Sequence, residues 1–253
     1  MKKIFLCLLF CLALNHGWAQ ERIDTDRPDQ TESAFTVPKN FFQGEFGFGK
    51  ENAKNKNYQL AHPAFLVKYG ISKKMELRLE GNFFSEYLYQ LPNTESSFVF
   101  DPLEIGAKLK LLDEKNWLPQ TSLIVHLGLP FTTTGSNAGQ SVFPSFRFVF
   151  QHGLGSTTGV GANFGAAWDG YGGRPVWLYT LSPNINIGKN WYAYVELFGF
   201  MQSNELSQHN IDAGIAYYIS SNTKLDVSAG AGLGNSELKN YAAIGFSFRI
   251  GPK

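Results

Sequence analysis

A two-residue alternation over Met75–Tyr87 (MELRLEGNFFSEY) constrains the fold of this chain more than any other feature. Odd positions are mostly apolar, whereas even positions carry Glu76, Arg78 and Glu80. Side chains alternate between two faces only in a β-strand, so the pattern predicts a strand with one apolar wall and one charged wall. The run is long for a soluble protein and suits a tilted membrane-spanning strand of roughly 9–11 residues.

The same alternation continues to the end of the chain. About twelve strands are expected, an even number as in closed single-chain barrels. They cover residues 41–50, 58–69, 75–87, 100–112, 117–131, 140–151, 157–168, 175–187, 191–201, 209–219, 224–233 and 240–250. Tight polar turns near residues 72, 114, 154, 189 and 222 alternate with longer loops, of which residues 88–99 form one. Short periplasmic turns and long external loops are typical of an antiparallel up-and-down transmembrane β-barrel, here with both chain ends on the periplasmic side.

Composition supports an all-β membrane barrel. Aromatic residues make up 15% of the chain and charged residues 17%, which suits a lipid-facing wall with aromatic rims. No run approaches the roughly 18 apolar residues of a transmembrane helix. A soluble β-sandwich is the alternative, but it would need a polar outer face on most strands. Here one face is broadly apolar and the other combines Gly and Ser with charge, so the barrel is favoured.

The first nineteen residues have the features of a signal peptide. Lys2 and Lys3 precede the apolar run Ile4–Leu14, and the small residues Gly17 and Ala19 stand two apart, as a signal peptidase requires. A membrane anchor is the alternative, but the run is too short to span a bilayer. Cleavage is expected after Ala19, with export to the outer membrane of a Gram-negative cell.

The mature chain offers little for other kinds of chemistry. Both cysteines, Cys7 and Cys11, lie in the leader, which excludes disulfide and thiolate chemistry afterwards. Without Lys2 and Lys3 the chain has 20 Lys and Arg against 21 Asp and Glu, a net charge of −1. That balance provides no basic field for nucleic acid. No spacing of His, Cys and Asp suggests a zinc site, and no cofactor is expected.

Residues 20–40 separate the leader from the first strand and show no periodicity. They are dense in charge and contain Pro28 and Pro38, which fix the local backbone. One interpretation is a solvated, flexible tail. The other is a plug that folds into the barrel mouth and places its charged side chains against the lumen wall. The binding candidates in this segment are Asp24, Asp26, Arg27 and Asp29.

The run Ile23–Asp29 (IDTDRPD), continued by Gln30–Glu32 and by Val37 and Pro38, resembles the opening of a bacterial outer-membrane protein family. Its members are described as "transporter" or as proteins of a putative phenol meta-degradation pathway. The resemblance extends over the mature chain in length and strand rhythm, and T-D-R-P is its one specific motif. It implies an outer-membrane β-barrel for uptake of small, often apolar compounds. It also implies that Asp26, Arg27 and Pro28 matter most in the segment, and it brings no catalytic residue.

The inner wall of the predicted barrel carries charges of both signs. Such charges inside a narrow barrel must be paired or hydrated, so a ladder of compensated pairs is one interpretation and a selectivity filter the other. Tyr192, Tyr194 and Tyr218 are available to an apolar or aromatic solute or fill the lumen. The binding candidates on this wall are Arg78, Glu80, Lys108, Arg147, Glu196, Asp212 and Arg249.

Passive uptake of a small solute, with apolar and aromatic compounds as the candidates, is the leading functional hypothesis. A closed structural or surface barrel is a second. A lipid-modifying enzyme is a third, because Ser122 and His126 share a strand face, although no Gly-x-Ser-x-Gly occurs. The expected partners are membrane lipid, an unknown small solute and the barrel-assembly machinery, which would recognise the last strand through Phe246 and Phe248.

Overall fold

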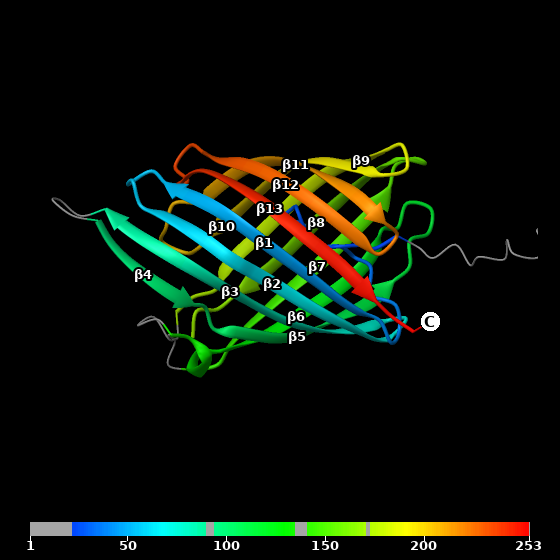
Figure 1. Cartoon of the computed structure of the whole chain (residues 1–253), viewed down its shortest axis with the longest axis horizontal. Helices are drawn as coiled ribbons and strands as arrows, with labels where there is room; N and C mark the ends of the chain where they lie inside the picture. The colour runs from blue at the N-terminus through cyan, green and yellow to red at the C-terminus, as the bar shows by residue number, and fades with distance from the viewer. Residues whose placement is uncertain (1–21, 90–93, 135–140, 171–172, 253) are drawn as a thin grey trace, which may run out of the picture.

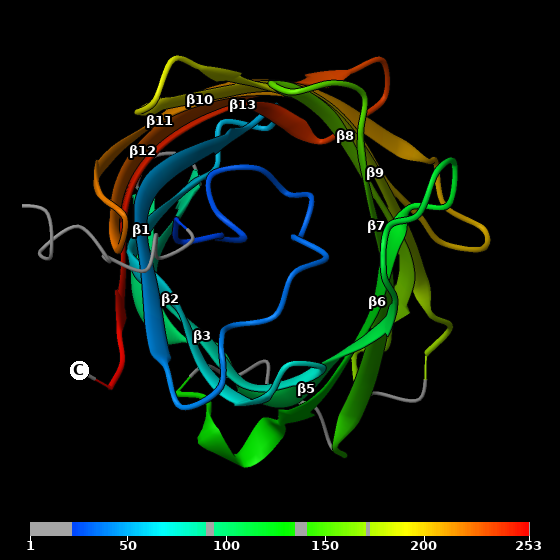
Figure 2. The ribbon, with the colours of Figure 1, turned by 90° about the vertical axis from the view of Figure 1, so that its right-hand side faces the viewer.

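Alternating segments of the chain form the strands of a closed barrel in the computed structural model, which describes residues 22–89, 94–134, 141–170 and 173–252 (Figures 1 and 2). The expected signal peptide and its cleavage point lie outside these residues. The strands are β1 (Phe42–Ala53), β2 (Tyr58–Ser72), β3 (Met75–Tyr89), β4 (Thr94–Phe100), β5 (Leu103–Leu112), β6 (Gln120–Leu129), β7 (Phe143–Gly153), β8 (Thr158–Ala167), β9 (Val176–Ile187), β10 (Trp191–Met201), β11 (Gln208–Ser220), β12 (Thr223–Leu233) and β13 (Leu238–Ile250). A short 3-10 helix, η1 (Pro130–Thr132), follows β6.

Antiparallel pairing closes the sheet upon itself. β1 pairs with β13 on one side, where Phe42 lies opposite Ile250, and with β2 on the other, where Phe42 lies opposite Tyr69. β4 and β5 both pair with β3, and only Asp101 and Pro102 separate them. They are therefore two parts of one barrel strand, and the barrel has twelve strands around its circumference, as the alternation predicts.

The predicted loop over residues 88–99 is wrong in its described part. β3 continues to Tyr89, and Thr94 begins β4, so this hairpin extends as strand beyond the predicted end at Tyr87. Ser96 and Ser97 are polar on both faces, which removes the alternation that marks a membrane-embedded strand. Backbone pairing continues past the apolar band because hydrogen bonds between strands do not need it.

The two walls differ as predicted from the alternation. Ile105, Val125, Leu197 and Ile215 are exposed on the outer wall. Charged residues on the inner wall are buried, including Glu76, Lys108 and Glu196 at 0–1% exposure. The interior of this protein is thus charged rather than apolar. No helix in the described ranges is long and apolar enough to cross a membrane.

Residues 22–40, here called the N-terminal segment, lie inside the ring of strands (blue in Figure 2). The barrel end with the turns β2–β3, β9–β10 and β11–β12 is here called the turn end. The backbone N–H of Ile23 donates to Ser221 O at 2.7 Å in the β11–β12 turn, and that of Asn40 donates to Gly70 O at 2.8 Å. Both ends of the segment are therefore held at the turn end, and the residues between them enter the lumen.

Candidate functional site

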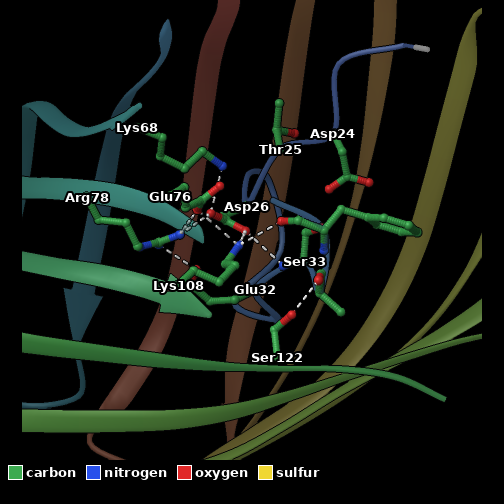
Figure 3. A network of polar contacts seen from close by, with 12 residues as sticks. Asp24, Thr25, Asp26, Glu32, Ser33, Lys68, Glu76, Arg78, Lys108 and Ser122 are labelled. Carbon is green, nitrogen blue, oxygen red and sulfur yellow. Dashed lines mark hydrogen bonds and ion pairs between the residues drawn. The ribbon is translucent and has the colours of Figure 1, made fainter. Parts of the chain in front are cut away.

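Asp26 is the centre of the contact between the N-terminal segment and the wall (Figure 3). Its Oδ2 lies 2.8 Å from Lys68 Nζ and 2.9 Å from Arg78 Nη1, and its Oδ1 lies 3.2 Å from Lys108 Nζ. The backbone N–H of Ser33 also donates to Oδ1 at 2.8 Å. One carboxylate thus meets three cations from β2, β3 and β5.

These charges are buried, so each depends on the others. The side chains of Lys68, Arg78 and Lys108 are 0–2% exposed, and that of Asp26 is 6% exposed. Burial alone would raise the pKa of Asp26, but Lys108, Lys68 and Arg78 hold that pKa well below its usual range. The aspartate therefore stays ionised while the segment is docked. Breaking such a buried set typically costs about 3–5 kcal/mol, because the remaining charges are left unpaired.

Glu45 on β1 binds the backbone of the segment. Its Oε2 accepts the backbone N–H groups of Asp26 and Arg27 at 3.0 and 3.1 Å. Its Oε1 lies 2.5 Å from Lys68 Nζ, which joins it to the Asp26 cluster. The same carboxylate thus fixes two successive peptide groups and neutralises a wall cation.

Two further carboxylates extend the cluster along the segment. Glu76 accepts the backbone N–H of Val37 at 2.6 Å and lies 3.1 Å from Arg78. Glu32, on the segment itself, lies 2.6 Å from Arg78 and 3.6 Å from Arg147 on β7. Arg78 is therefore bound by acids from both the wall and the segment.

Arg27 occupies a slot on the wall formed by β1, β13 and β12. Its Nη2 lies 2.9 Å from Asp226 on β12, and its carbonyl accepts Lys224 Nζ at 2.5 Å. The guanidinium passes over Gly47 and Gly245, which lie opposite each other on β1 and β13. A Cβ at Gly47 would approach Arg27 Nη1 to 2.1 Å, so a side chain there would displace the guanidinium from this position.

Polar contacts of another kind connect Asp29 with β9 and β10. Its Oδ2 accepts the hydroxyl of Tyr192 at 3.1 Å and that of Ser182 at 3.3 Å. Burial raises the pKa of Asp29 to about 7, although Lys224 and these hydroxyls lower it. Next along the chain, the backbone N–H of Gln30 donates to Glu196 Oε2 at 2.7 Å. This side of the segment is held mainly by neutral donors and carboxylates rather than by cations.

A cavity of about 430 Å³ lies against the segment. Asp29 and Glu32 from the segment border it, and Glu80, Glu104 and Arg147 line its wall. Glu80 and Glu104 lie directly opposite each other on β3 and β5. The cavity is thus lined by more carboxylates than cations, although no group of His, Cys, Asp and Glu in the described ranges is arranged to hold a metal ion.

The structure brings most of the candidates together around the segment. Asp26, Arg78 and Lys108 are in direct contact, and Arg147 joins them through Glu32. Asp24 lies beside this cluster, and Arg249 lies away from it. Burial raises the pKa of Asp24, which forms no ion pair within the described chain. Arg249 donates to Asn222 Oδ1 at 3.0 Å near the turn end, away from the Asp26 cluster.

Three residues that matter most were absent from the candidates. Glu45, Lys68 and Lys224 each contact the segment and are 1–2% exposed. Each stands at a polar position of a predicted strand, which was the one available signal. Which of the polar wall residues contact the segment depends on where the segment lies in the lumen, and the sequence does not show this.

The comparisons with known proteins agree with this architecture. Residues 25–250 match the family described as "Putative MetA-pathway of phenol degradation". The chain belongs to this family. The match begins at Thr25, so it includes the Asp26–Arg27–Pro28 stretch as well as the strands.

Solved structures of outer-membrane proteins have a fold similar to that of this chain. An outer membrane channel from Pseudomonas putida F1 has a TM-score of 0.65 and 13% identity, covering 86% of this chain and 98% of that one. The KdgM porin in complex with oligogalacturonate has a TM-score of 0.56 and 10% identity, covering 81% and 98%. The NanC porin has a TM-score of 0.52 and 9% identity, covering 83% and 100%. No curated protein matches the chain. The closed barrel and its apolar outer wall are those of an outer-membrane protein.

Proposed function

We propose that this protein is an outer-membrane channel for passive uptake of a small solute, and that the N-terminal segment plugs its lumen at rest. One observation carries the proposal: Asp26 bridges Lys68, Arg78 and Lys108 on β2, β3 and β5, while Gln30 and Thr31 bind Glu196 on β10, six strands around the barrel from β3. A segment bound on opposite walls lies across the lumen. Solutes would pass only when these contacts break.

The solute is proposed to be small and to carry polar groups. The solved relatives are a channel and porins, one of them holding oligogalacturonate. The cavity beside the segment adds Ala64, Phe65 and Leu66 to its carboxylates, so a ring would find apolar contacts as well as polar ones there. This lining favours a polar or aromatic polar solute over a purely aliphatic one.

The deciding experiment compares the mature chain with a chain that starts at Lys39. Both are refolded and inserted into a planar bilayer, and single-channel conductance is recorded. Truncation removes every contact of Asp26 and Arg27, so we expect conductance to appear or to rise sharply. Silence from both chains, with insertion verified by heat-dependent gel mobility, would contradict the pore and support a closed structural barrel.

An enzymatic role finds less support in the geometry. Ser122 Oγ donates to Ala34 O at 2.6 Å, whereas His126 Nε2 lies 3.2 Å from Arg78 Nε. The hydroxyl and the imidazole are thus engaged with different partners, and a nucleophile needs its base at hydrogen-bond distance. Hydrolase activity on lipid micelles that is lost in His126→Ala would revive this alternative.

Export by a leader and insertion by the barrel-assembly machinery remain part of the proposal.

A further inference from the structure

Two acids face each other beneath the segment without a cation. Glu196 on β10 and Asp212 on β11 are direct register partners, and their side chains point into the lumen. They are 1% and 3% exposed. Within the described chain neither forms an ion pair with Lys, Arg or His. Adjacent carboxyl groups removed from water are not both ionised, because desolvation and repulsion act in the same direction.

The hydrogen bonds around the pair leave one carboxyl oxygen unused. Tyr241 donates its hydroxyl to Asp212 Oδ2, but Asp212 Oδ1 is buried without a partner. Glu196 accepts the backbone N–H of Gln30 and the hydroxyl of Thr31. A proton held between Glu196 and Asp212 would satisfy the free oxygen and remove the repulsion.

The cations that contact this part of the segment are bound by other groups; Arg147, for example, donates to Gln30 O at 3.2 Å. Arg27 is paired with Asp226, and Lys224 donates to Thr25 Oγ1 and Arg27 O. The β9 residues next to the pair, Thr180 and Ser182, carry no charge. The titratable groups that face the pair are Asp29 on the segment, Tyr194 on β10 and Tyr241 on β13; Tyr192 and Tyr218, Lys224 and Asp226 lie further along the same wall on β10, β11 and β12.

We propose that Glu196 and Asp212 share one proton at neutral pH and form a pH-sensitive contact that holds the N-terminal segment in the lumen. This inference rests on the proposed function of the segment as a plug. Gln30 and Thr31 lie against Glu196 and shield the pair from water. When the segment leaves, water reaches both carboxyl groups and the shared proton dissociates into bulk solvent.

The direction of the pH effect follows from this exchange. The docked state binds one proton more than the open state, so docking weakens as the pH rises. The ratio of open to docked chains would increase by up to about tenfold per pH unit within the titration window. Asp29 lies on the same side of the segment and titrates near neutrality, so its contribution must be separated from that of the pair.

The test measures conductance of the mature chain between about pH 6 and pH 9. Glu196→Gln keeps one oxygen for the Gln30 N–H, offers its amide NH2 to Thr31 Oγ1 and removes the titrating proton, so this variant should stay closed across the range while the unmodified chain opens. Asp212→Asn should also stay closed across this pH range. Asp113→Asn, a change in an exposed turn, is the matched control and should open like the unmodified chain.

A second measurement does not depend on conduction. Ala34→Cys places a thiol at a site that is 0% exposed in the docked segment. The rate of maleimide labelling is compared with the rate for the same cysteine in the Glu196→Gln background, which cancels the titration of the thiol itself. We expect the ratio of the two rates to rise with pH.

The outcomes separate the two proposals. A chain starting at Lys39 that conducts, beside a mature chain that does not respond to pH, would overturn the shared proton and leave the plug intact. A pH response that persists in Glu196→Gln and disappears in Asp29→Asn would assign the effect to Asp29 and would also overturn the shared-proton proposal. A silent truncated chain would refute the pore, and the labelling ratio would then decide the shared proton alone.

Discussion

Arg27 lies 2.9 Å from Asp226 across a floor formed by two facing glycines, Gly47 and Gly245. A Cβ at Gly245 would come within 2.3 Å of Arg27 Nε, and one at Gly47 within 2.1 Å of Nη1. The aspartate is fully buried, so it depends on the guanidinium for its neutralisation. The wall is therefore shaped for this arginine, which connects the T-D-R-P motif with three strands of the barrel.

Gly47→Ala tests this fit. The added methyl group must displace the guanidinium, and overpacking of this kind costs typically about 1–3 kcal/mol. We expect docking of the segment to weaken by roughly ten- to a hundredfold, because each 1.4 kcal/mol corresponds to a factor of ten. Open-channel probability in a planar bilayer measures the effect. Gly155→Ala is the control, since its Cβ would meet only Thr158 Oγ1 at 3.4 Å, and an equal response in both variants would contradict the slot.

Asp26→Asn tests the centre of the cluster. The amide keeps the shape of the side chain but leaves the positive charges of Lys68, Arg78 and Lys108 without their shared partner. Docking should lose about 3–5 kcal/mol, as when one member of a buried ion pair is removed. Labelling of Ala34→Cys by maleimide should accelerate accordingly, and conductance should rise.

The matched control for this variant is Asp24→Asn. It removes one acid from the same segment, but Asp24 forms no ion pair in the described ranges. Labelling of Ala34→Cys should change far less than in Asp26→Asn. Equal effects would mean that the total charge of the segment, rather than the contacts of Asp26, determines docking.

The cavity beside the segment should prefer cations. Glu80 and Glu104 lie directly opposite each other and line the cavity with Glu45 and Asp101, whereas Arg147 is the one cation among the described lining residues that a chain starting at Lys39 keeps. In a chain starting at Lys39, a KCl gradient should give a reversal potential that favours K⁺. The double variant Glu80→Gln/Glu104→Gln should reduce this preference, and Asp113→Asn should not. Anion preference in the truncated chain would contradict the prediction.

Sequence periodicity could predict the barrel because the two walls face different solvents. Each strand must repeat the alternation to place Leu and Phe toward lipid and charge toward the lumen. Alternation could not predict the strand within residues 88–99. Beyond the apolar band both faces of the strand meet water, so Ser96 and Ser97 do not alternate with apolar residues although they form part of β4.

The sequence could predict the type of contact that the segment makes, but not which wall residues it contacts. Charge at Asp26 and Arg27 suited a plug bound to the wall as well as a solvated tail, and their partners Lys108 and Asp226 stand 82 and 199 residues away in the chain. Which wall charge the segment contacts depends on how the barrel closes and on the stagger between strands. A local sequence pattern determines neither. Lys68 and Glu45 look like any other polar positions until β1 and β2 are placed beside the segment.

The outer wall provides the last test. Ile105, Val125, Leu197 and Ile215 are 38–45% exposed on four different strands. Arginine at each position must enter lipid, at a cost of about 2–4 kcal/mol near the bilayer midplane. Refolding into liposomes, followed by heat-dependent gel mobility, should show reduced insertion for each variant. Ser156→Arg, in the exposed β7–β8 turn, is the control and should insert normally. Tolerance of arginine at all four positions would reverse the assignment of faces, because an arginine that costs nothing there would have to face water.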